Sequence, residues 1–166
     1  MSKIHLNNVR LSFPSIFNKA TFEGKETKFE ATLLIPKSDT ATKAVLDEAI
    51  KSLLAEAKMK VGADKICLKD GDDSDYDGYE GNWSLKASNS KRPRLVNKDK
   101  TPIVEEDNIL YAGCYVNAII DLWAQNNGYG KRVNANLLGI QFVKDGDSFE
   151  GSKVADEDDF DDLGDL

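Results

Sequence analysis

The stretch from Tyr111 to Val143 constrains the fold of this chain more than any other part of the sequence. From Cys114 onward, small and apolar residues alternate with larger or polar ones, and a second alternating run opens at Lys131. Asn127-Gly128 lies between the two runs, and this dipeptide favours positive φ in a tight hairpin turn. Gly139 interrupts the second run, as expected at a β-bulge that bends a strand. The pattern predicts a long, bent hairpin, which is typical of a small closed barrel.

The outward side of this hairpin carries an unusual set of side chains for a protein surface. It combines the aromatic residues Tyr115 and Trp123 with Arg132, Asn134 and Asn136. Such a surface suits unpaired nucleic acid, because bases stack on rings and phosphates pair with guanidinium groups. Side-chain amides can hydrogen-bond to the edges of several different bases. The alternative is that the rings only cover a barrel end or a second sheet. The hairpin by itself leaves both interpretations open.

Earlier parts of the chain predict two more strands and one helix. Alternating apolar residues indicate a first strand from Lys3 to Phe13, with a phase slip near Asn7-Asn8, and a second strand from Phe29 to Pro36. The capping side chains of Ser38–Thr40 precede a helical pattern from Thr42 to Lys60, which we expect to pack over one end of the barrel. The apolar residues of this pattern are Val45, Leu46, Ala49, Ile50, Leu53, Leu54 and Ala57.

The stretch from Leu68 to Gly81 is acidic and rich in turn residues. Part of it reproduces the first half of a calcium-binding loop, through Asp73, Asp75, Asp77 and Gly78. The second half does not match, because the twelfth position is Ser84 instead of Glu and no helices flank the stretch. We interpret it as a solvated acidic loop whose Tyr76 and Tyr79 remain available to a ligand, and we keep a calcium-binding module as the minor alternative. No metal site and no cofactor is expected.

A further strand is predicted from Trp83, with Leu85 and Ala87 on the same parity. It leads into the basic stretch from Asn89 to Asn97, the densest positive cluster of the sequence. Its cations are Lys91, Arg92 and Arg94. Such a cluster is usually a solvated turn, but here we expect it to form a charged groove together with the aromatic hairpin. The polar segment from Lys98 to Asn108 is expected to loop back, with Pro102 and Ile103 touching the surface.

The charge of the chain is divided unevenly. Seven of its 29 acidic residues lie between Asp156 and Leu166, and the remaining 22 balance the 22 lysines and arginines. The net charge of −7 therefore belongs to the C-terminus, and the body is neutral. For this reason a pI near 4.8 does not argue against nucleic-acid binding by the body. We expect one domain over residues 1–152 and a flexible acidic tail over residues 153–166.

Other features exclude whole classes of function. The sole histidine is His5, which leaves no partner for a His-based metal site or a Ser/His/Asp arrangement. Cys67 and Cys114 are far apart in apolar contexts, so buried free thiols are expected. No apolar run reaches the length of a signal peptide or a membrane span, which predicts a cytoplasmic protein with no membrane partner. The acidic residues that a metal-dependent nuclease would use lie in a Gly-rich loop. No enzymatic activity is expected.

Seven short motifs are spread over nearly the entire chain. They are LSFPSIF, LLIPKSD, LKDGD, NSKRPRLV, GCYVNA, LWAQNNGYGKRVNA and DDFDDL. Together they resemble a family of bacteriophage single-stranded DNA-binding proteins, and the block from Gly113 to Ala135 is the most specific part. The resemblance implies a mainly β fold: an OB-type five-stranded antiparallel barrel elaborated by one α-helix and loops. It also implies a role in phage replication and recombination in the host cytoplasm, with an acidic tail that recruits replication proteins of phage or host and modulates DNA access.

The combined prediction is non-enzymatic binding of single-stranded DNA with little sequence preference, by base stacking and phosphate neutralisation. Parity and charge, not the resemblance, select the expected nucleic-acid-binding residues: Trp83, Lys86, Lys91, Arg92, Arg94, Tyr115, Trp123, Tyr129, Lys131, Arg132, Asn134 and Asn136. The expected partner-binding residues of the tail are Asp158, Asp159, Phe160, Asp161, Asp162, Leu163 and Leu166. A protein-interaction adaptor that uses the tail is the alternative. The sequence leaves open whether the protein is a monomer or a homodimer, and which tryptophan stacks on bases.

Overall fold

The computed structural model describes residues 3–76, 78–149 and 163–164. The strands of the main sheet are β1 (Ile4–Ser15), β4 (Phe29–Pro36), β5 (Leu68–Asp70), β6 (Asn82–Asn89), β7 (Arg94–Val96), β8 (Tyr115–Asn127) and β9 (Gly130–Lys144). A separate ribbon consists of β2 (Thr21–Phe22) and β3 (Lys25–Glu26). The helical elements are α1 (Thr40–Ala57) and the short 3₁₀ turns η1 (Ala63–Lys65), η2 (Gly71–Asp73) and η3 (Glu105–Asp107).

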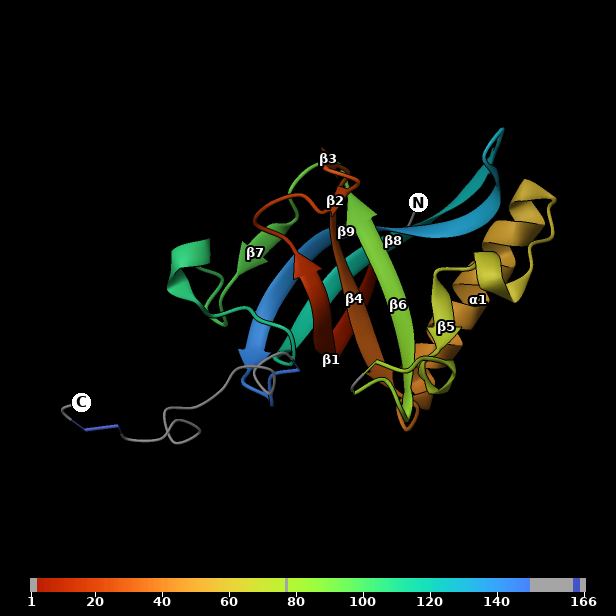
Figure 1. Cartoon of the computed structure of the whole chain (residues 1–166). Coiled ribbons are helices and arrows are strands. Elements are labelled where there is room, and N and C mark those ends of the chain that lie inside the picture. Colours follow the sequence, from red (N-terminus) through yellow and green to blue (C-terminus); the bar gives the residue numbers. More distant parts are fainter. Residues whose placement is uncertain (1–2, 77, 150–162, 165–166) are drawn as a thin grey trace.

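Five of these strands close into a barrel. Along the sheet the order is β5-β6-β4-β1-β8-β9-β7, and β6 also pairs with β9. The ladders within this ring are antiparallel except for the closing contact between Ser88 and Asn136, which is parallel. In Figure 1, β1, β4 and β6 lie side by side in front, and β8 and β9 cross behind them. The structure confirms the predicted mainly β, five-stranded barrel, and it adds β5 and β7 at the margins.

Inward-facing side chains of the five strands form the barrel core. Leu6, Leu33, Leu85, Ile120 and Leu137 come from β1, β4, β6, β8 and β9 in turn, and each is fully buried. Burial of a side chain of this size contributes about 1.5–3 kcal/mol relative to its exposure to water. The alternation seen in the sequence is therefore the alternation between the inside and the outside of the barrel.

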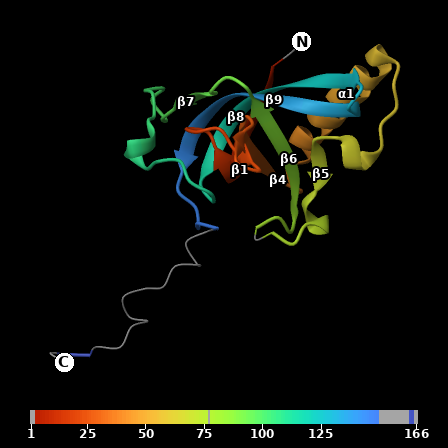
Figure 2. The same ribbon diagram turned by 45° about the horizontal axis from the view of Figure 1, so that its top comes forward.

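Helix α1 covers one end of the barrel, as predicted. Leu46 and Ile50 join the barrel core, and the far end of the β8–β9 hairpin lies beside the helix (Figures 1 and 2). Asp39 caps the helix, since its Oδ1 accepts a hydrogen bond from the backbone N–H of Thr42 at 3.1 Å. The helix begins and ends two to three residues before the predicted bounds. The predicted apolar stripe is too wide, because Val45 is 54% exposed.

The β8–β9 hairpin is paired over its whole length, from Tyr115 opposite Lys144 to Asn127 opposite Gly130. The predicted bend lies beside Gly139: Leu138 is an extra residue in the ladder and shifts the register. The turn differs from the prediction in its dihedral angles. Positive φ falls on Gly130, at 117°, and on neither residue of the Asn-Gly pair.

Strand β1 contains two irregularities. The first, between Leu6 and Val9, confirms the predicted phase slip, and Asn8 has a φ of 54° there. The second lies between Ser12 and Ser15, and Phe13 within it has a φ of 45°. Phe13 is the last apolar residue of the alternating run that predicted this strand, but the bulge turns its ring outward and leaves it 48% exposed.

Two segments predicted as loops contain strands. β5 lies in the acidic stretch and pairs with β6, and β7 lies in the basic stretch and pairs in parallel with β9. Both strands are three residues long, which is too short for alternation to reveal them. Ile103, which we expected to touch the surface, is buried, and its backbone N–H donates to the carbonyl of Leu95 at 2.9 Å.

The predicted boundary at residue 152 and nearly all of the acidic tail lie outside the described residues. Of the tail residues named above, only Leu163 is described, and its side chain is 69% exposed. Within the described part, no helix is long and apolar enough to span a membrane.

Candidate nucleic-acid interface

A groove of about 1590 Å³ crosses the outer face of β4 and β6. Thr32 of β4 and Lys86 of β6 line it. Cys67, just before β5, and Arg132 and Asn134 of β9 line it farther along. The groove forms here because β6 and β9 meet only around Ser88 and Asn136, while the backbone N–H of Cys67 bridges to the carbonyl of Val133 at 3.0 Å. Its aromatic side chains are Phe13, Tyr76, Tyr79, Trp83 and Tyr111.

Strand register places a polar row across three neighbouring strands at the groove, which Thr32 and Lys86 line. Ser12 pairs with Thr32, and Thr32 pairs with Lys86, so the three residues lie next to one another on β1, β4 and β6. The ammonium group of Lys86 is 3.3 Å from Oε2 of Glu30, and the lysine side chain is 66% exposed. An ion pair this open to water contributes little to stability, which leaves the cation available to a phosphate.

Phe13, Tyr76 and Tyr79 form an aromatic cluster at one end of the groove. The ring centroids of Phe13 and Tyr76 are 4.8 Å apart, and those of Tyr76 and Tyr79 are 5.4 Å apart. Tyr79 is buried, and its hydroxyl is 2.9 Å from Oγ of the buried Ser12. Phe13 and Tyr76 are 48% and 60% exposed. One ring of the cluster is therefore fixed in the fold, and two stand open.

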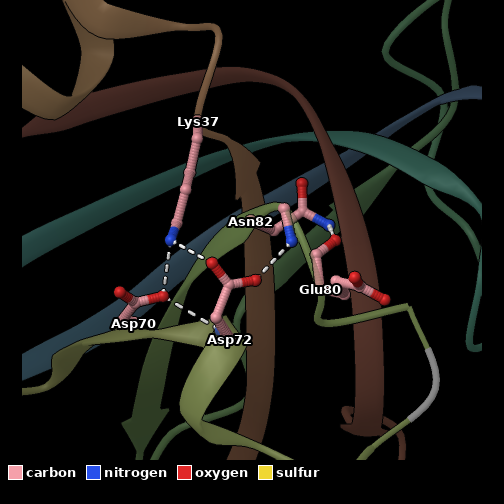
Figure 3. A network of polar contacts seen from close by, with 6 residues as sticks. Lys37, Asp70, Asp72, Glu80 and Asn82 are labelled. Atoms are coloured by element: carbon pink, nitrogen blue, oxygen red, sulfur yellow. Dashed lines mark hydrogen bonds and ion pairs between the residues drawn. The ribbon is translucent and has the colours of Figure 1, made fainter.

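A lysine braces the loop that carries Tyr76 and Tyr79 (Figure 3). The ammonium group of Lys37 is 2.7 Å from Oδ1 of Asp70 and 2.6 Å from Oδ2 of Asp72, and Oδ1 of Asp72 accepts the backbone N–H of Gly81 at 2.8 Å. Hydrogen bonds from Lys37 hold the pKa of both carboxyl groups below the usual range, and the same bonds raise the pKa of Lys37. Two acidic residues of this stretch thus neutralise a lysine.

The described carboxylates of the same stretch do not gather into a cation site. Among the residues that the structure describes, no group of three His, Cys, Asp or Glu side chains is placed to hold a metal ion. One of the three aspartates in the calcium-like pattern, Asp77, lies outside those residues.

Trp83 lines the groove but belongs to the core parity of β6. Its ring packs against the barrel core, and the ammonium groups of Lys37 and Lys43 lie 4.7 and 4.4 Å from the ring centroid. Two cations already occupy positions over this ring. Its position favours a supporting role, at the point where α1 meets β6.

The outer face of the hairpin satisfies many of its own polar groups. Nδ2 of Asn136 donates to Oδ1 of Asp121 at 2.7 Å, and Nδ2 of Asn134 donates to Oε1 of Gln125 at 2.8 Å. Trp123 is half-buried opposite Asn134, one strand away from the groove. The predicted outward parity of these residues is confirmed, and cross-strand amide bonds hold the face rigid.

Tyr115 lies on the same face at the other end of the hairpin, about 26 Å from Trp123 along β8. The ammonium group of Lys144 is 4.9 Å from its ring centroid, and the guanidinium of Arg10 is 5.7 Å away. Arg10 also covers the ring of Phe149 at 4.2 Å and donates to the carbonyl of Asp147 at 2.5 Å. Tyr115 therefore sits in a cluster of rings and cations that the chain itself completes.

The predicted residues fall into separate groups. Trp83, Lys86, Arg132 and Asn134 line the main groove; Trp123 and Asn136 flank it; Tyr129 and Lys131 are exposed at the hairpin turn, Tyr129 at 91%. The basic stretch is elsewhere. Arg92 and Arg94 line a second hollow of about 400 Å³, and Arg92 donates to the carbonyl of Phe17 at 2.6 Å. Lys91, next to them, is exposed. The basic stretch lines this second hollow together with Leu138 of the hairpin, whereas Arg132 and Asn134 of the hairpin line the main groove.

Two exposed aromatic residues of the groove were not in the expected binding set. Phe13 was counted only in the apolar run of the first strand, and Tyr76 was left out of the binding set. The Phe13-Pro14 pair at the end of a strand was the available signal, since proline cannot donate to the ladder and often marks a bulge or an edge. Tyr76 was kept as available to a ligand in the acidic loop, but its place at the end of the groove depends on contacts of Lys37 that no local pattern shows.

Both cysteines are free thiols, as expected, although Cys67 is only half-buried. Burial raises the pKa of Cys67 to about 11 and also raises the pKa of Cys114. A thiol that stays protonated at neutral pH is a poor nucleophile, even though Cys67 lines the groove.

Comparison with known proteins identifies relatives over nearly the full length. A sequence model of the family described as "Enterobacter phage Enc34, ssDNA-binding protein" matches residues 2–165. "Putative protein p50" of Acyrthosiphon pisum secondary endosymbiont phage 1 is 41% identical over 173 residues, which cover 97% of this chain and 94% of that protein.

Solved structures agree with this match. The single-stranded DNA-binding protein of bacteriophage Enc34 in complex with ssDNA superposes with a TM-score of 0.82 at 36% identity, covering 89% of each chain. The gp2.5 protein of bacteriophage T7, a single-stranded DNA-binding protein, has a TM-score of 0.62 at 13% identity over 95% of this chain and 99% of its own, which shows a shared fold. This chain belongs to the Enc34 family of bacteriophage single-stranded DNA-binding proteins.

Proposed function

We propose that this protein binds single-stranded DNA with little sequence preference, along the groove over β4 and β6. The observation that carries the proposal is its membership of a family with an ssDNA complex at 36% identity, together with a groove that presents both cations and rings. Unpaired strands need both kinds of contact, since the backbone is anionic and each base has a π-face.

Lys86 and Arg132 are the cations best placed for phosphates, because they lie in the groove on neighbouring strands. Asn134 lies beside Arg132 and, with Trp123 on the next strand, extends the surface onto the hairpin. Neutralised phosphates release counterions, so the affinity depends on salt. The other expected residues on the hairpin turn and the basic stretch remain predictions for the path of the strand beyond the groove.

Titration of a labelled oligo-dT with the full chain tests the proposal directly. With about three phosphate contacts, raising the salt from 50 to 200 mM weakens single-strand binding roughly 20-fold. Oligonucleotides of mixed sequence bind within a few-fold of oligo-dT. A salt-insensitive or strongly sequence-selective titration contradicts the proposal. Mg²⁺ in the same reactions tests for cleavage of the oligonucleotide, and intact product is the expected result.

In the host cytoplasm such a protein protects single strands during phage replication and recombination. The acidic stretch from Asp156 to Leu166 carries seven carboxylates, which compete with phosphate for the groove cations at an effective concentration on the order of millimolar. Its apolar residues Phe160, Leu163 and Leu166 suit a basic-rimmed pocket on a replication protein of phage or host. Deletion of residues 156–166 is expected to tighten oligo-dT binding at low salt, and unchanged or weaker binding contradicts the competition.

A further inference from the structure

The aromatic cluster at the end of the groove has an open side. Phe13 and Tyr76 expose about half of their side chains into the groove, and their rings meet edge to face with an interplanar angle of 71°. Among the described residues, the only aromatic or cationic groups packed against these two rings are the rings themselves and Tyr79. A planar, uncharged ligand can therefore contact them from the groove side.

We propose that Phe13 and Tyr76 form a stacking site for one unpaired nucleobase at this end of the groove, with Lys86 binding a neighbouring phosphate. The site deepens the proposed function and rests on it. Nucleobases are the ligand class that fits, because a flat π-face stacks on open rings while the linked phosphate needs a cation nearby.

Packing alone does not account for the cluster. Tyr79 already closes the loop onto the barrel, since it is buried and its hydroxyl contacts the buried Ser12. A ring that only served the core would be buried as Tyr79 is. Phe13 is instead turned outward by a bulge, and its own backbone has a φ of 45° there. Residues other than glycine rarely adopt this left-handed conformation. Strained backbone of this kind concentrates at functional sites.

The separation of the backbones of Ser12, next to Phe13, and Lys86 suits one or two nucleotide steps. Ser12, beside Phe13 and under Tyr79, lies in the same cross-strand row as Lys86, two strands away. Neighbouring strands are about 4.8 Å apart, so the backbones of Ser12 and Lys86 are roughly 10 Å apart. The long side chain of Lys86 reaches back over part of that gap, and its Nζ is already directed to Glu30 on the intervening strand.

The loop of Tyr76 is held ready for the ligand. Lys37 ties Asp70 and Asp72 together, and the side chain of Asn82 donates to the carbonyl of Gly78 at 2.7 Å. The bonded residues lie both before and after Tyr76 in the chain. The backbone N–H of Tyr76 itself donates to Oγ of Ser74 at 3.2 Å. A stacking site held in place before the ligand arrives loses less conformational entropy on binding.

Oligonucleotide titrations of the full chain separate this site from the rest of the groove. Tyr76→Ala is expected to raise the Kd for oligo-dT about 5- to 30-fold, and Tyr76→Phe to restore wild-type affinity, since the ring is what stacks. Neither variant changes the Kd for an abasic oligonucleotide of the same length. Phe22→Ala is the matched control, because Phe22 is 69% exposed but does not line the groove, and its oligo-dT affinity stays at the wild-type value. Circular dichroism checks that every variant is folded.

Ultraviolet cross-linking to oligonucleotides containing 5-iododeoxyuridine locates the base. Cross-linked peptides that contain Phe13 or Tyr76 support the site. Cross-links found only at other aromatic residues, or equal losses of Tyr76→Ala affinity for oligo-dT and the abasic strand, overturn it. These results are distinct from failure of the proposed function, in which the wild-type chain itself does not bind oligo-dT.

Discussion

Two aromatic clusters lie next to each other on this barrel: the groove cluster of Phe13, Tyr76 and Tyr79, and a second cluster of Tyr115 and Phe149. The chain covers the rings of the second cluster and leaves two rings of the groove cluster exposed. Phe149, in the second cluster, lies against Gly78 in the loop that carries Tyr76 of the first. In the second cluster, Arg10 and Lys144 cover the rings, and the segment from residue 145 to 149 closes it. In the groove cluster, Phe13 and Tyr76 stay open. Aromatic residues on a surface therefore mark a ligand site only where the chain has not already supplied their partners.

The closed cluster depends on a glycine. Gly113 has a φ of 114°, and a Cβ there would collide with the carbonyl oxygen of Asp147. Gly113→Ala is therefore expected to lower the free energy of unfolding by about 3 kcal/mol, which corresponds to a Tm roughly 6–12 °C lower for a chain of this size. Gly128→Ala is the control, because no atom lies within 4 Å of its Cβ position. Thermal unfolding by circular dichroism measures both. Equal Tm values for the two variants would show that the segment after β9 does not need this close contact.

Charge reversal compares the cations of the two regions. Lys86→Glu in the groove is expected to raise the Kd for oligo-dT about 10- to 30-fold, because it removes the proposed phosphate contact and adds a repulsive charge. Lys144→Glu changes the net charge equally beside the closed cluster and is expected to raise the Kd less than 3-fold. Fluorescence anisotropy at 50 mM salt measures both. Similar losses for the two variants would mean that overall charge, and not the groove, controls binding.

Alanine substitution of Trp123 and of Tyr115 tests which end of the hairpin's outer face contacts DNA. Trp123→Ala is expected to weaken oligo-dT binding about 5-fold, since Trp123 lies beside the groove residue Asn134. Tyr115→Ala is expected to change the Kd less than 2-fold, because the tyrosine is already engaged by Arg10 and Lys144. If Tyr115→Ala weakens binding as much as Trp123→Ala, the whole outer face binds DNA and the closed cluster is not closed to ligands.

The smallest expected effect is on thermal stability at low pH, where the ion pairs of Lys37 with Asp70 and Asp72 are lost. The folded pKa values of Asp70 and Asp72 lie below their unfolded values, so the stabilisation from Lys37 is complete above about pH 4 and is lost as the pH falls through the folded pKa values. Lys37→Met is expected to unfold at a slightly lower Tm at pH 7 and to lose less Tm than the wild type between pH 5 and pH 2. Parallel plots of Tm against pH for the two proteins would show that the ion pairs of Lys37 do not contribute to stability. Lys43→Met, in the same region but paired with Asp47, is the control.

The local pattern of the chain determined the barrel strands, the helix and the outward parity of the hairpin. Alternation at period two and helical spacing are local properties, and burying one face of each element is favourable wherever the element ends up. For the same reason Lys86, Trp123, Arg132 and Asn134 could be assigned to an outer surface from the sequence, and the motifs were sufficient to suggest the family. The alternation predicts on which side of a strand a residue lies, but it does not show which other parts of the chain cover that side.

Only the tertiary structure decided which part of that outer surface is concave. The parallel contact between Ser88 and Asn136 closes the barrel and creates the groove, and it joins residues far apart in the chain. The bulge at Phe13 and the brace at Lys37 bring two rings to the end of the groove, whereas Arg10 and the segment after β9 cover Tyr115. These contacts depend on the closure of the whole barrel, so no local pattern can report them.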